Sequence, residues 1–386
     1  MKAVTRCLAL AVFLSSCLAT AGCWDFKEVN HMNYLSALAI DYIDGEYVVY
    51  LQANTFTNIA KTESVKPQGN KTSVVGTGKG NTIGDAIFHL YQTAQMRVYW
   101  GQIKALVCTK RALLKAGVVD LTDLINRYRE MRYNLWVFGT EDSPERLFNN
   151  APYFGLSIFD SILMKPDETY RQFSLIAPMF LHRFLSDFYE KGKTAMLPIL
   201  SYDKKSWEEG AKPSPQLKIV GAFFFRNEKL FGMLNGEQLE GKAFMTQKMI
   251  RMPIKIYNTN QTTPAVTFVV HTKKVRIDYE IEDNTVQYDI TISVKAYLDE
   301  MMENISQERM KRLLKQAIAE RIRSTYEIGK KIDTDVLNLQ YDMYKFHHRD
   351  WVKYVKDDPK MKAARLRNIK VKASIAHSGK YKEYVY

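Results

Sequence analysis

The chain has few cysteines and, after its N-terminus, no long hydrophobic run. Only 4 of its 386 residues are cysteine, too few for the disulfide framework that stabilises small secreted domains. No stretch beyond the first 22 residues approaches the roughly 20 apolar residues that cross a bilayer as a helix. The chain is 46% hydrophobic and contains 23 tyrosines and 19 phenylalanines, which is typical of a folded globular protein.

Sequence motifs for catalysis and metal binding are also missing. The sequence contains no Gly-x-Ser-x-Gly elbow, no His-Glu-x-x-His zinc motif and no paired-cysteine zinc pattern. His347 and His348 are adjacent to one another near Asp350, but successive helical residues point about 100° apart and do not readily share one metal ion. We therefore predict no enzyme activity, no metal and no cofactor.

A glycine-rich segment resembles a phosphate-binding loop only superficially. Four glycines lie around Lys79, but this lysine is followed by Gly80 rather than by the Ser or Thr of a P-loop. We interpret the segment as a flexible turn before a helix, at the end of a polar loop over Thr57–Asn81. The glycines are Gly76, Gly78, Gly80 and Gly84.

The N-terminus has the three parts of an export signal. Lys2 and Arg6 precede an uncharged run, which ends in small residues immediately before Cys23. A cysteine at the cleavage position is typical of a bacterial lipoprotein, in which the thiol accepts diacylglycerol and the cysteine becomes the new N-terminus. Thr20 stands where such signals usually have leucine. We expect residues 1–22 to be removed and Cys23 to carry a lipid anchor, since two acyl chains suffice for stable anchoring.

Two further expectations follow from export. The formal net charge is +13, which favours contact with anionic lipid headgroups or anionic wall polymers, whereas nucleic acid lies in the compartment that the protein leaves. With Cys23 acylated, Cys108 has no disulfide partner. Cys108 ends an apolar stretch and is expected in the core rather than as a reactive thiol.

Residues 23–200 alternate between strand and helix patterns, which predicts an α/β domain with a mixed sheet. Asp44-Gly45 marks a hairpin between two strands. Asn81 and Thr82 are placed to cap a helix. The chain then loses its apolar periodicity over residues 201–215, and we predict a linker between domains there.

Residues 216–386 form the predicted C-terminal part, an α+β unit of antiparallel sheet packed on long helices, with an alternative division near residue 262 that would set off a small middle domain. Asp283-Asn284 separates two strongly alternating strands. Asn304 and Gln307 resemble a capping box. The helix that follows has one apolar stripe, made of Met310, Leu313, Leu314, Ala317, Ile318, Ile322 and Tyr326.

Blocks of residues along the chain resemble one family of bacterial proteins. They are Cys23-Trp24-Asp25, Glu28-Val29-Asn30, Leu38-Ala39-Ile40-Asp41, Gly80 to Ala86, Gly101-Gln102-Ile103-Lys104, Leu197-Pro198, Asp335-Val336, Trp351 and Ile369 to Gly379. Together they resemble the Ger(x)C family, the lipoprotein C subunits of spore germinant receptors. The resemblance covers essentially all of the chain after residue 22.

The resemblance implies a non-enzymatic subunit with a lipid at Cys23. Such a protein would be tethered to the outer face of the spore inner membrane. It would act with two polytopic partners, an A subunit and a transporter-like B subunit, in the response to small nutrients. No ligand-binding residues carry over from the family to this chain.

Two other classes of function are kept as alternatives. A lipid-anchored solute-binding protein would hold the nutrient itself in a cleft between two lobes, although the two halves of this chain are differently patterned. A wall-modifying enzyme would need a nucleophile, an acid pair or a metal set, and none can be identified. Tight nutrient binding by the isolated protein would favour the solute-binding alternative.

Overall fold

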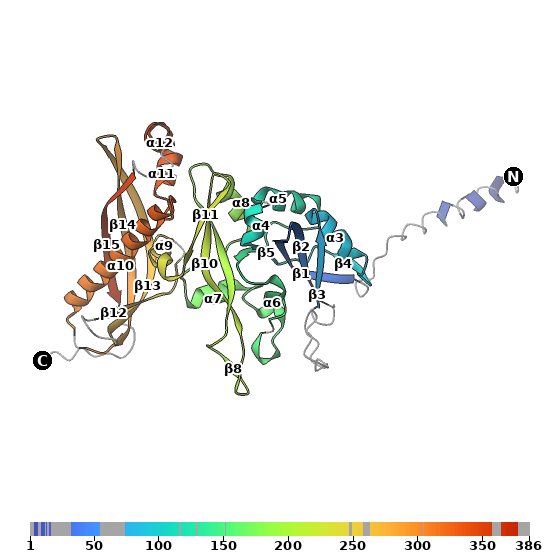
Figure 1. Ribbon diagram of the computed structural model, residues 1–386, viewed down its shortest axis with the longest axis horizontal. Helices are drawn as coiled ribbons and strands as arrows, with labels where there is room; N and C mark the ends of the chain where they lie inside the picture. The colour runs from blue at the N-terminus through green and yellow to red at the C-terminus, as the bar shows by residue number, and fades with distance from the viewer. Residues whose placement is uncertain are drawn as a thin grey trace.

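The computed structural model describes residues 4–6, 9–11, 13, 15–16, 32–54, 74–115, 117–128, 130–150, 152–246, 249–257, 263–303, 305–356 and 364–376. It contains two large β-sheets at opposite ends of an elongated molecule, with the N-terminus beyond one end and the C-terminal sheet at the other (Figure 1). The predicted combination of a mixed N-terminal sheet with helices and a C-terminal sheet packed on helices is confirmed.

The first sheet, sheet A, has nine strands in the order β11-β10-β7-β6-β5-β1-β2-β3, with β4 paired to β1. The strands are β1 (Met32–Ile43), β2 (Glu46–Asn54), β3 (Val74–Gly80), β4 (Arg97–Tyr99), β5 (Ala105–Thr109), β6 (Trp136–Thr140), β7 (Ala195–Asp203), β10 (Gln216–Arg226) and β11 (Lys229–Asn235). The central strands β1, β5, β6 and β7 run parallel, and the outer strands join them antiparallel. Crossover helices between parallel strands give both faces of such a sheet a cover.

Helices cover both faces of sheet A. They are α3 (Ile83–Tyr91), α4 (Lys110–Lys115), α5 (Gly117–Arg127), α6 (Pro144–Phe148), α7 (Pro166–Gln172) and α8 (Leu181–Tyr189), with short 3₁₀ turns at Tyr153–Gly155 and Ile158–Asp160. One face forms a core with α3, α4, α5 and α8. The other packs against α6 and the segment that follows it. Cys108 lies fully inside the first core, as predicted.

The second sheet, sheet C, has four strands in the order β12-β13-β14-β15. They are β12 (Met252–Tyr257), β13 (Pro264–Glu282), β14 (Thr285–Met301) and β15 (Ala364–Ala376). Its helices are α9 (Glu240–Phe244, preceded by a 3₁₀ turn at Glu237–Leu239), α10 (Gln307–Lys331), α11 (Leu339–Phe346) and α12 (His348–Tyr354). The predicted turn at Asp283-Asn284 is present, and both residues have a positive φ.

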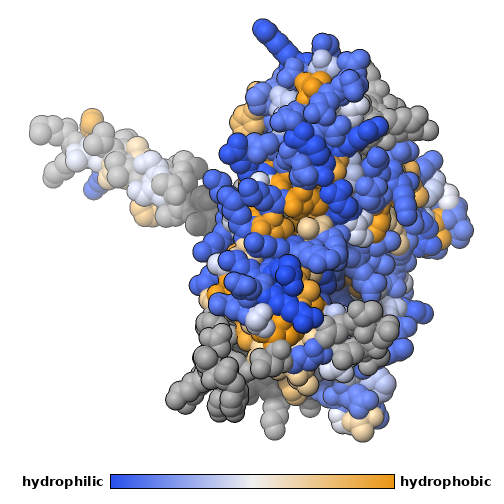
Figure 2. Space-filling view, turned by 90° about the vertical axis from the view of Figure 1, so that its left-hand side faces the viewer, coloured by the Kyte–Doolittle hydropathy of each residue, from blue (hydrophilic) through white to orange (hydrophobic). Residues whose placement is uncertain are grey.

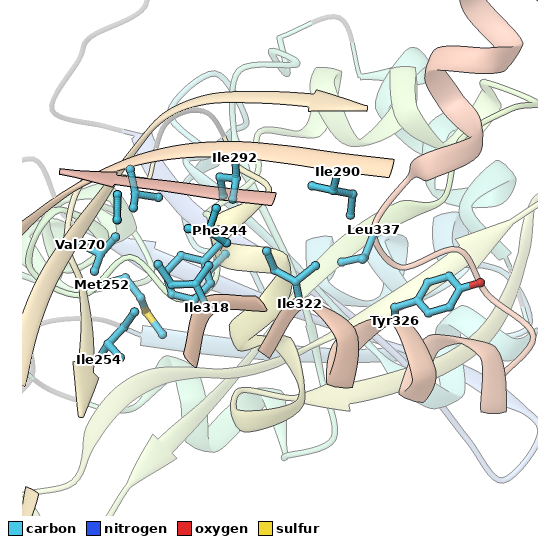
Figure 3. Close-up of a cluster of buried hydrophobic side chains, with 14 of the residues drawn as sticks. Phe244, Met252, Ile254, Val270, Ile290, Ile292, Ile318, Ile322, Tyr326 and Leu337 are labelled. Atoms are coloured by element: carbon cyan, nitrogen blue, oxygen red, sulfur yellow. The ribbon is translucent and has the colours of Figure 1, made fainter. Parts of the chain in front are cut away.

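The predicted apolar stripe of α10 forms the core of this unit. Ile318, Ile322 and Tyr326 point from α10 toward side chains of α9 and the sheet (Figure 3). In contrast to the prediction, β15 joins β14 in parallel, because the helices α10 to α12 return the chain to the end of the sheet where β14 begins. The N-cap of α10 is Ser306 rather than the predicted Asn304, which lies outside the described residues.

The predicted linker 201–215 is not a connection between sheets. Gln216 pairs with Asp203 and Lys218 with Ser201, so β7 and β10 are neighbours in sheet A. The chain between them forms a hairpin with two short strands, β8 (Glu208–Glu209) and β9 (Lys212–Pro213). Residues 216–235 complete sheet A, and residues 252–257 already belong to sheet C. In the described residues, the chain passes from sheet A to sheet C between Asn235 and Met252, and not near residue 262.

The glycine-rich segment is also different from the prediction. Residues 74–80 form strand β3 in register with β2, and the earlier part of the predicted loop lies outside the described residues. A Cβ on Gly78 would lie 2.1 Å from the carbonyl oxygen of Ala86, and one on Gly80 would lie 2.6 Å from its nitrogen. Glycine is therefore required where α3 packs directly onto β3. Thr82 caps α3 as predicted, accepting a hydrogen bond from the Asp85 N–H.

Candidate functional site at the joint between the two sheets

A surface depression of about 650 Å³ lies beside the start of β1. Its lining residues are Tyr91, Ala94, Gln95, Met96, Arg97, Val98, Trp100, Arg127, Tyr128 and Glu130. The volume is within the range of small-molecule sites. It is therefore the place in the described chain to test the solute-binding alternative.

Most polar groups of this depression already have protein partners. Trp100 stacks on Tyr128 with ring centroids 4.3 Å apart, and its indole N–H donates to the Tyr91 hydroxyl at 2.8 Å. The Trp100 backbone N–H donates to Glu130 at 3.1 Å, and Arg127 pairs with Asp123 at 2.7 Å. A ligand would have to displace these contacts. The depression is therefore lined by side chains that already bond to one another, which does not favour ligand binding.

The second candidate region lies where the segment before β7 and helix α9 contact helices α10 and α11, and we call this region between the two sheets the joint. Asn338 precedes α11 in a left-handed conformation, with φ of 58°, which asparagine tolerates better than most residues. Its side chain bonds to the backbone of Thr194, which immediately precedes β7. The Thr194 N–H donates to Oδ1 at 2.8 Å, and Nδ2 donates to the Thr194 carbonyl at 3.2 Å. One side chain thus connects the two halves of the molecule.

The loop that carries Thr194 packs closely on α11. A Cβ on Gly192 would lie 2.1 Å from Cγ of Tyr344, so only glycine lets the loop approach this ring. Lys193 forms an ion pair with Asp187 at 2.7 Å and places its ammonium 4.7 Å from the centre of the Tyr341 ring. Contacts from α8, the loop and α11 therefore meet within a few residues.

Helix α9 fastens the other side of the joint to α10. A Cβ on Gly241 would lie 2.3 Å from the carbonyl oxygen of Arg321, so the two backbones are in direct contact. The Gly241 N–H donates to Thr325 Oγ1 at 3.0 Å, and that hydroxyl donates to the Gln238 carbonyl at 2.7 Å. Because α9 follows β11 closely in the chain, this contact fixes the end of sheet A against the long helix of the second unit.

Two ionisable groups are desolvated at this joint. Burial lowers the pKa of Lys242 to about 8, and the nearby charge of Asp335 opposes the shift. Burial also raises the pKa of Asp335, against hydrogen bonds from backbone N–H groups and the charge of Lys242. Asp335 Oδ2 accepts from the Gln340 N–H at 2.9 Å, whereas Oδ1 has no hydrogen-bond partner among the described residues. Both groups are held where their charged forms are disfavoured.

A small apolar cluster completes the joint. It contains Ile176, Ala222, Phe224, Leu234, Leu239 and Val336, drawn from the segment between α7 and α8, from sheet A, from the turn before α9 and from the segment before α11. The joint can therefore hold the two sheets in a set orientation.

The residues that the sequence singled out are placed as follows. Cys23 lies outside the described residues. Burial raises the pKa of Cys108 to about 12, so this thiol is not a nucleophile at neutral pH. His347 and His348 pack against the aromatic rings of Tyr279 and Tyr344 respectively. Within the described ranges, no group of three or more His, Cys, Asp or Glu side chains could hold a metal ion.

Nothing in the sequence pattern points to the joint. Asn338, Gly192 and Gly241 belong to no recognisable motif, and their roles depend on contacts with residues far away in the chain. The residue types alone give two hints: asparagine tolerates a positive φ, and glycine permits close approach of another backbone or side chain. Neither hint identifies a partner.

Comparison with known proteins gives matches over nearly the whole chain. Residues 25–202 match the family described as spore germination protein N-terminal domain. Residues 220–379 match the family described as spore germination B3/GerAC like, C-terminal. The gap between the two matches falls at the hairpin that joins β7 to β10, inside sheet A.

Individual relatives are more distant. YfkR of Bacillus subtilis (strain 168), described as a candidate spore germination protein, is 24% identical over 76% of this chain and 74% of its own. Spore germination protein B3 of the same organism is 20% identical over 85% of this chain and 87% of its own. The crystal structure of the GerBC protein aligns with a TM-score of 0.50 and 14% identity, covering 89% of this chain and 97% of that one. No helix in the part of the chain that the structure describes is long and apolar enough to span a membrane.

Proposed function

This chain belongs to the GerAC family of spore germination proteins, and from that premise we propose that it is the lipid-anchored, non-catalytic C subunit of a spore nutrient germinant receptor. It is tethered through Cys23 to the outer face of the spore inner membrane. There it acts in assembly and signalling with two polytopic subunits, A and B.

The observation that carries this proposal is the pair of family matches in order along the chain, from residue 25 to residue 379. Three features support the finer parts. The export signal ends at Cys23, the chain has a net charge of +13, and the polar groups around Trp100 mostly bond to one another. The joint at Asn338 gives the subunit a place where a change at one sheet can reach the other.

The lipid anchor is tested by replacing the cysteine. Cys23→Ala should move the protein from the membrane to the soluble fraction of a strain that lacks the A and B subunits. Cys17→Ala is the matched control, since Cys17 precedes the cleavage position, and this variant should stay in the membrane. A Cys23→Ala protein that survives a high-salt wash on the membrane would reject the anchor.

The receptor role is tested separately from the anchor. Deleting the gene should abolish germination in response to one set of nutrients and spare others. Purified residues 24–386, which keep every buried core residue from Tyr34 onward, should bind no amino acid or sugar at millimolar concentration in calorimetry. Tight binding of one nutrient would favour the solute-binding alternative instead.

A further inference from the structure

One face of sheet C carries a group of lysines on three adjacent strands. Register places Lys274 of β13 and Lys372 of β15 on either side of Ser293 in β14. Lys370 lies beside Thr291, and Lys295 lies two residues beyond Ser293 on the same face. We call Lys274, Lys295, Lys370 and Lys372 the lysine strip. From strand spacing, the strip measures about 10 Å across the strands and about 14 Å along them.

The lysine strip lies on the face of sheet C away from its core. The buried side chains of β14, such as Ile290, Ile292 and Val294, point to α10 on the opposite face. Lys274, Lys370 and Lys372 are exposed, and Lys295 is partly exposed. The end of the molecule that carries sheet C presents a largely hydrophilic surface, with scattered hydrophobic groups (Figure 2).

The charges of the strip are not neutralised by the carboxylates described around it. None of its four ammonium groups lies within ion-pair distance of a carboxylate in the described ranges. Lys295 instead lies over the Tyr297 ring, 4.7 Å from its centre. The neighbouring His271 has a lowered pKa, caused first by partial burial and then by the charges of Lys295 and Arg251, which agrees with a positive potential here.

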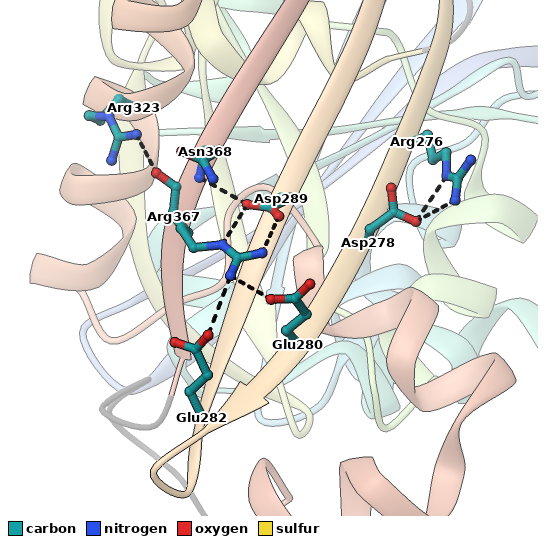
Figure 4. Close-up of polar contacts among 8 residues, drawn as sticks. All are labelled: Arg276, Asp278, Glu280, Glu282, Asp289, Arg323, Arg367 and Asn368. Carbon is teal, nitrogen blue, oxygen red and sulfur yellow. Dashed lines mark hydrogen bonds and ion pairs between the residues drawn. The ribbon is translucent and has the colours of Figure 1, made fainter.

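Toward the β13–β14 turn, the acidic residues of this face are paired with arginines, whereas Asp299 and Glu300 are exposed at the other end of β14. Arg367 binds Asp289 at 2.5 Å and Glu280 at 2.5 Å, and Arg276 binds Asp278 at 2.9 Å (Figure 4). These pairs lie toward the β13–β14 turn. The face is thus divided into a paired region near the turn and an unpaired, cationic region at the lysine strip.

We propose that the lysine strip docks on the headgroups of anionic phospholipids, as a second point of membrane attachment. By register, the four lysines flank Thr291 and Ser293 in the sheet, and ammonium and hydroxyl groups are suited to the oxygens of a phosphodiester. Each lysine near an anionic leaflet contributes severalfold to binding. Sheet C, which carries the strip, lies at the opposite end of the molecule from β1, the first described strand after Cys23 (Figure 1), so the two attachments would hold the protein along the membrane.

We name a bilayer rather than a soluble polyanion as the partner because a tether at Cys23 would keep the protein beside a membrane. In this respect the inference rests on the proposed function. Lipid binding by the strip itself needs no anchor. It can therefore be measured on unlipidated residues 24–386, and failure of one proposal does not imply failure of the other.

The experiment compares vesicles of phosphatidylcholine with vesicles of equal parts phosphatidylcholine and phosphatidylglycerol. The protein should sediment with the anionic vesicles, and the binding should weaken as salt is raised, because salt screens surface charges. Changing the four strip lysines to glutamine should reduce the binding at least about tenfold. The matched control changes Lys104, Lys205, Lys229 and Lys311, four exposed lysines elsewhere, to glutamine and should retain most of it.

Three results would overturn the proposal. One is equal binding to both kinds of vesicle, and another is an equal loss in both quadruple variants, which would indicate net charge alone. The third is strip-dependent binding of soluble polyphosphate with no binding to anionic vesicles, which would assign the strip to a soluble polymer. Circular dichroism of both variants should match the parent, since all eight lysines lie outside the core.

Discussion

Asn338 holds the backbone of Thr194 through both polar atoms of its amide, at 2.8 and 3.2 Å. The two residues are 144 positions apart: Thr194 immediately precedes β7 of sheet A, and Asn338 immediately precedes α11, which packs into the core of sheet C. These two hydrogen bonds fix the orientation of the Asn338 amide, because its oxygen must face the Thr194 N–H and its nitrogen the Thr194 carbonyl.

Asn338→Gly should destabilise the protein by about 1–3 kcal/mol, because the buried Thr194 N–H loses its acceptor. Asn338→Ala should cost about 1–2 kcal/mol more, since alanine is strained at this positive φ. The measurement is the free energy of unfolding in urea. Asn284→Gly is the control, since Asn284 has the same φ of 58° in an exposed turn, and it should change stability by less than about 0.5 kcal/mol.

Gly78→Ala and Gly84→Ala should have opposite effects. A methyl group at Gly78 would meet the Ala86 carbonyl at 2.1 Å, whereas the nearest atom to one at Gly84 is 3.9 Å away. We expect a loss of about 1–3 kcal/mol from overpacking at Gly78 and a gain of about 0.5–1 kcal/mol at the helical Gly84. Thermal melts of the two variants compare them directly. A stabilised Gly78→Ala protein would contradict the close packing of α3 on β3.

Lys242→Met should remove a pH dependence of stability. The pKa of Lys242 falls from 10.5 in the unfolded chain to about 8 in the folded one, so the folded state binds this proton less tightly. Its unfavourable contribution is therefore absent above pH 10.5, grows as the pH falls toward 8, and is complete below it. A shift of this size corresponds to about 3 kcal/mol at most.

The expected result is a difference between two unfolding curves. Stability of the parent relative to Lys242→Met should rise between pH 8 and pH 10, and at pH 7 the methionine variant should be at least as stable as the parent. Urea unfolding at several pH values gives both quantities. Parallel pH profiles would show that Lys242 is solvated in the folded protein.

Arg367→Ala should destabilise the protein more than Arg276→Ala. Arg367 pairs with three carboxylates, Asp289, Glu280 and Glu282, and is 30% exposed, whereas Arg276 is 69% exposed and pairs with one. We expect a measurable loss for Arg367, since it bonds to several carboxylates at once, and little or no loss for the more exposed Arg276. Urea unfolding of both variants makes the comparison, and equal losses would show that the Arg367 network adds nothing.

The Arg367 effect should depend on pH. Hydrogen bonds from Arg367 are the main reason why the pKa of Asp289 lies below its ordinary value of 3.8. A lowered folded-state pKa stabilises the protein above the unfolded value, and this stabilisation is lost as the pH falls through the folded one. The difference between parent and Arg367→Ala should therefore be full at pH 6 and shrink below pH 4.

The strands of sheet C could be predicted because one face of each is buried. Val286, Tyr288 and Ile290 alternate with polar residues, and this period of two identifies a strand without knowledge of its neighbours. Strand β3 was missed since its sequence, Val74–Gly80, is mostly glycine, lysine and threonine. Its glycines leave room for α3, and that reason exists only in the folded protein.

Sheet membership could not be predicted from local pattern. β10 has the same apolar character whether it begins a new domain or completes an existing sheet, and the polar hairpin before it resembles a linker. The pairing of Gln216 with Asp203 shows that β10 belongs to sheet A. The joint was missed for a related reason, because a lone Asn338 or Gly241 acquires its role from residues more than 80 positions away.

The pairing of β7 with β10 determines at which residue the protein can be truncated without exposing a sheet edge. A fragment ending at residue 202, where the first family match ends, would leave β7 without β10 and uncover the apolar Leu197 and Ile199 beside unsatisfied backbone groups. Bare sheet edges of this kind pair with other chains. Such a fragment should therefore aggregate, whereas one ending after Asn235 keeps both outer strands and should remain dispersed.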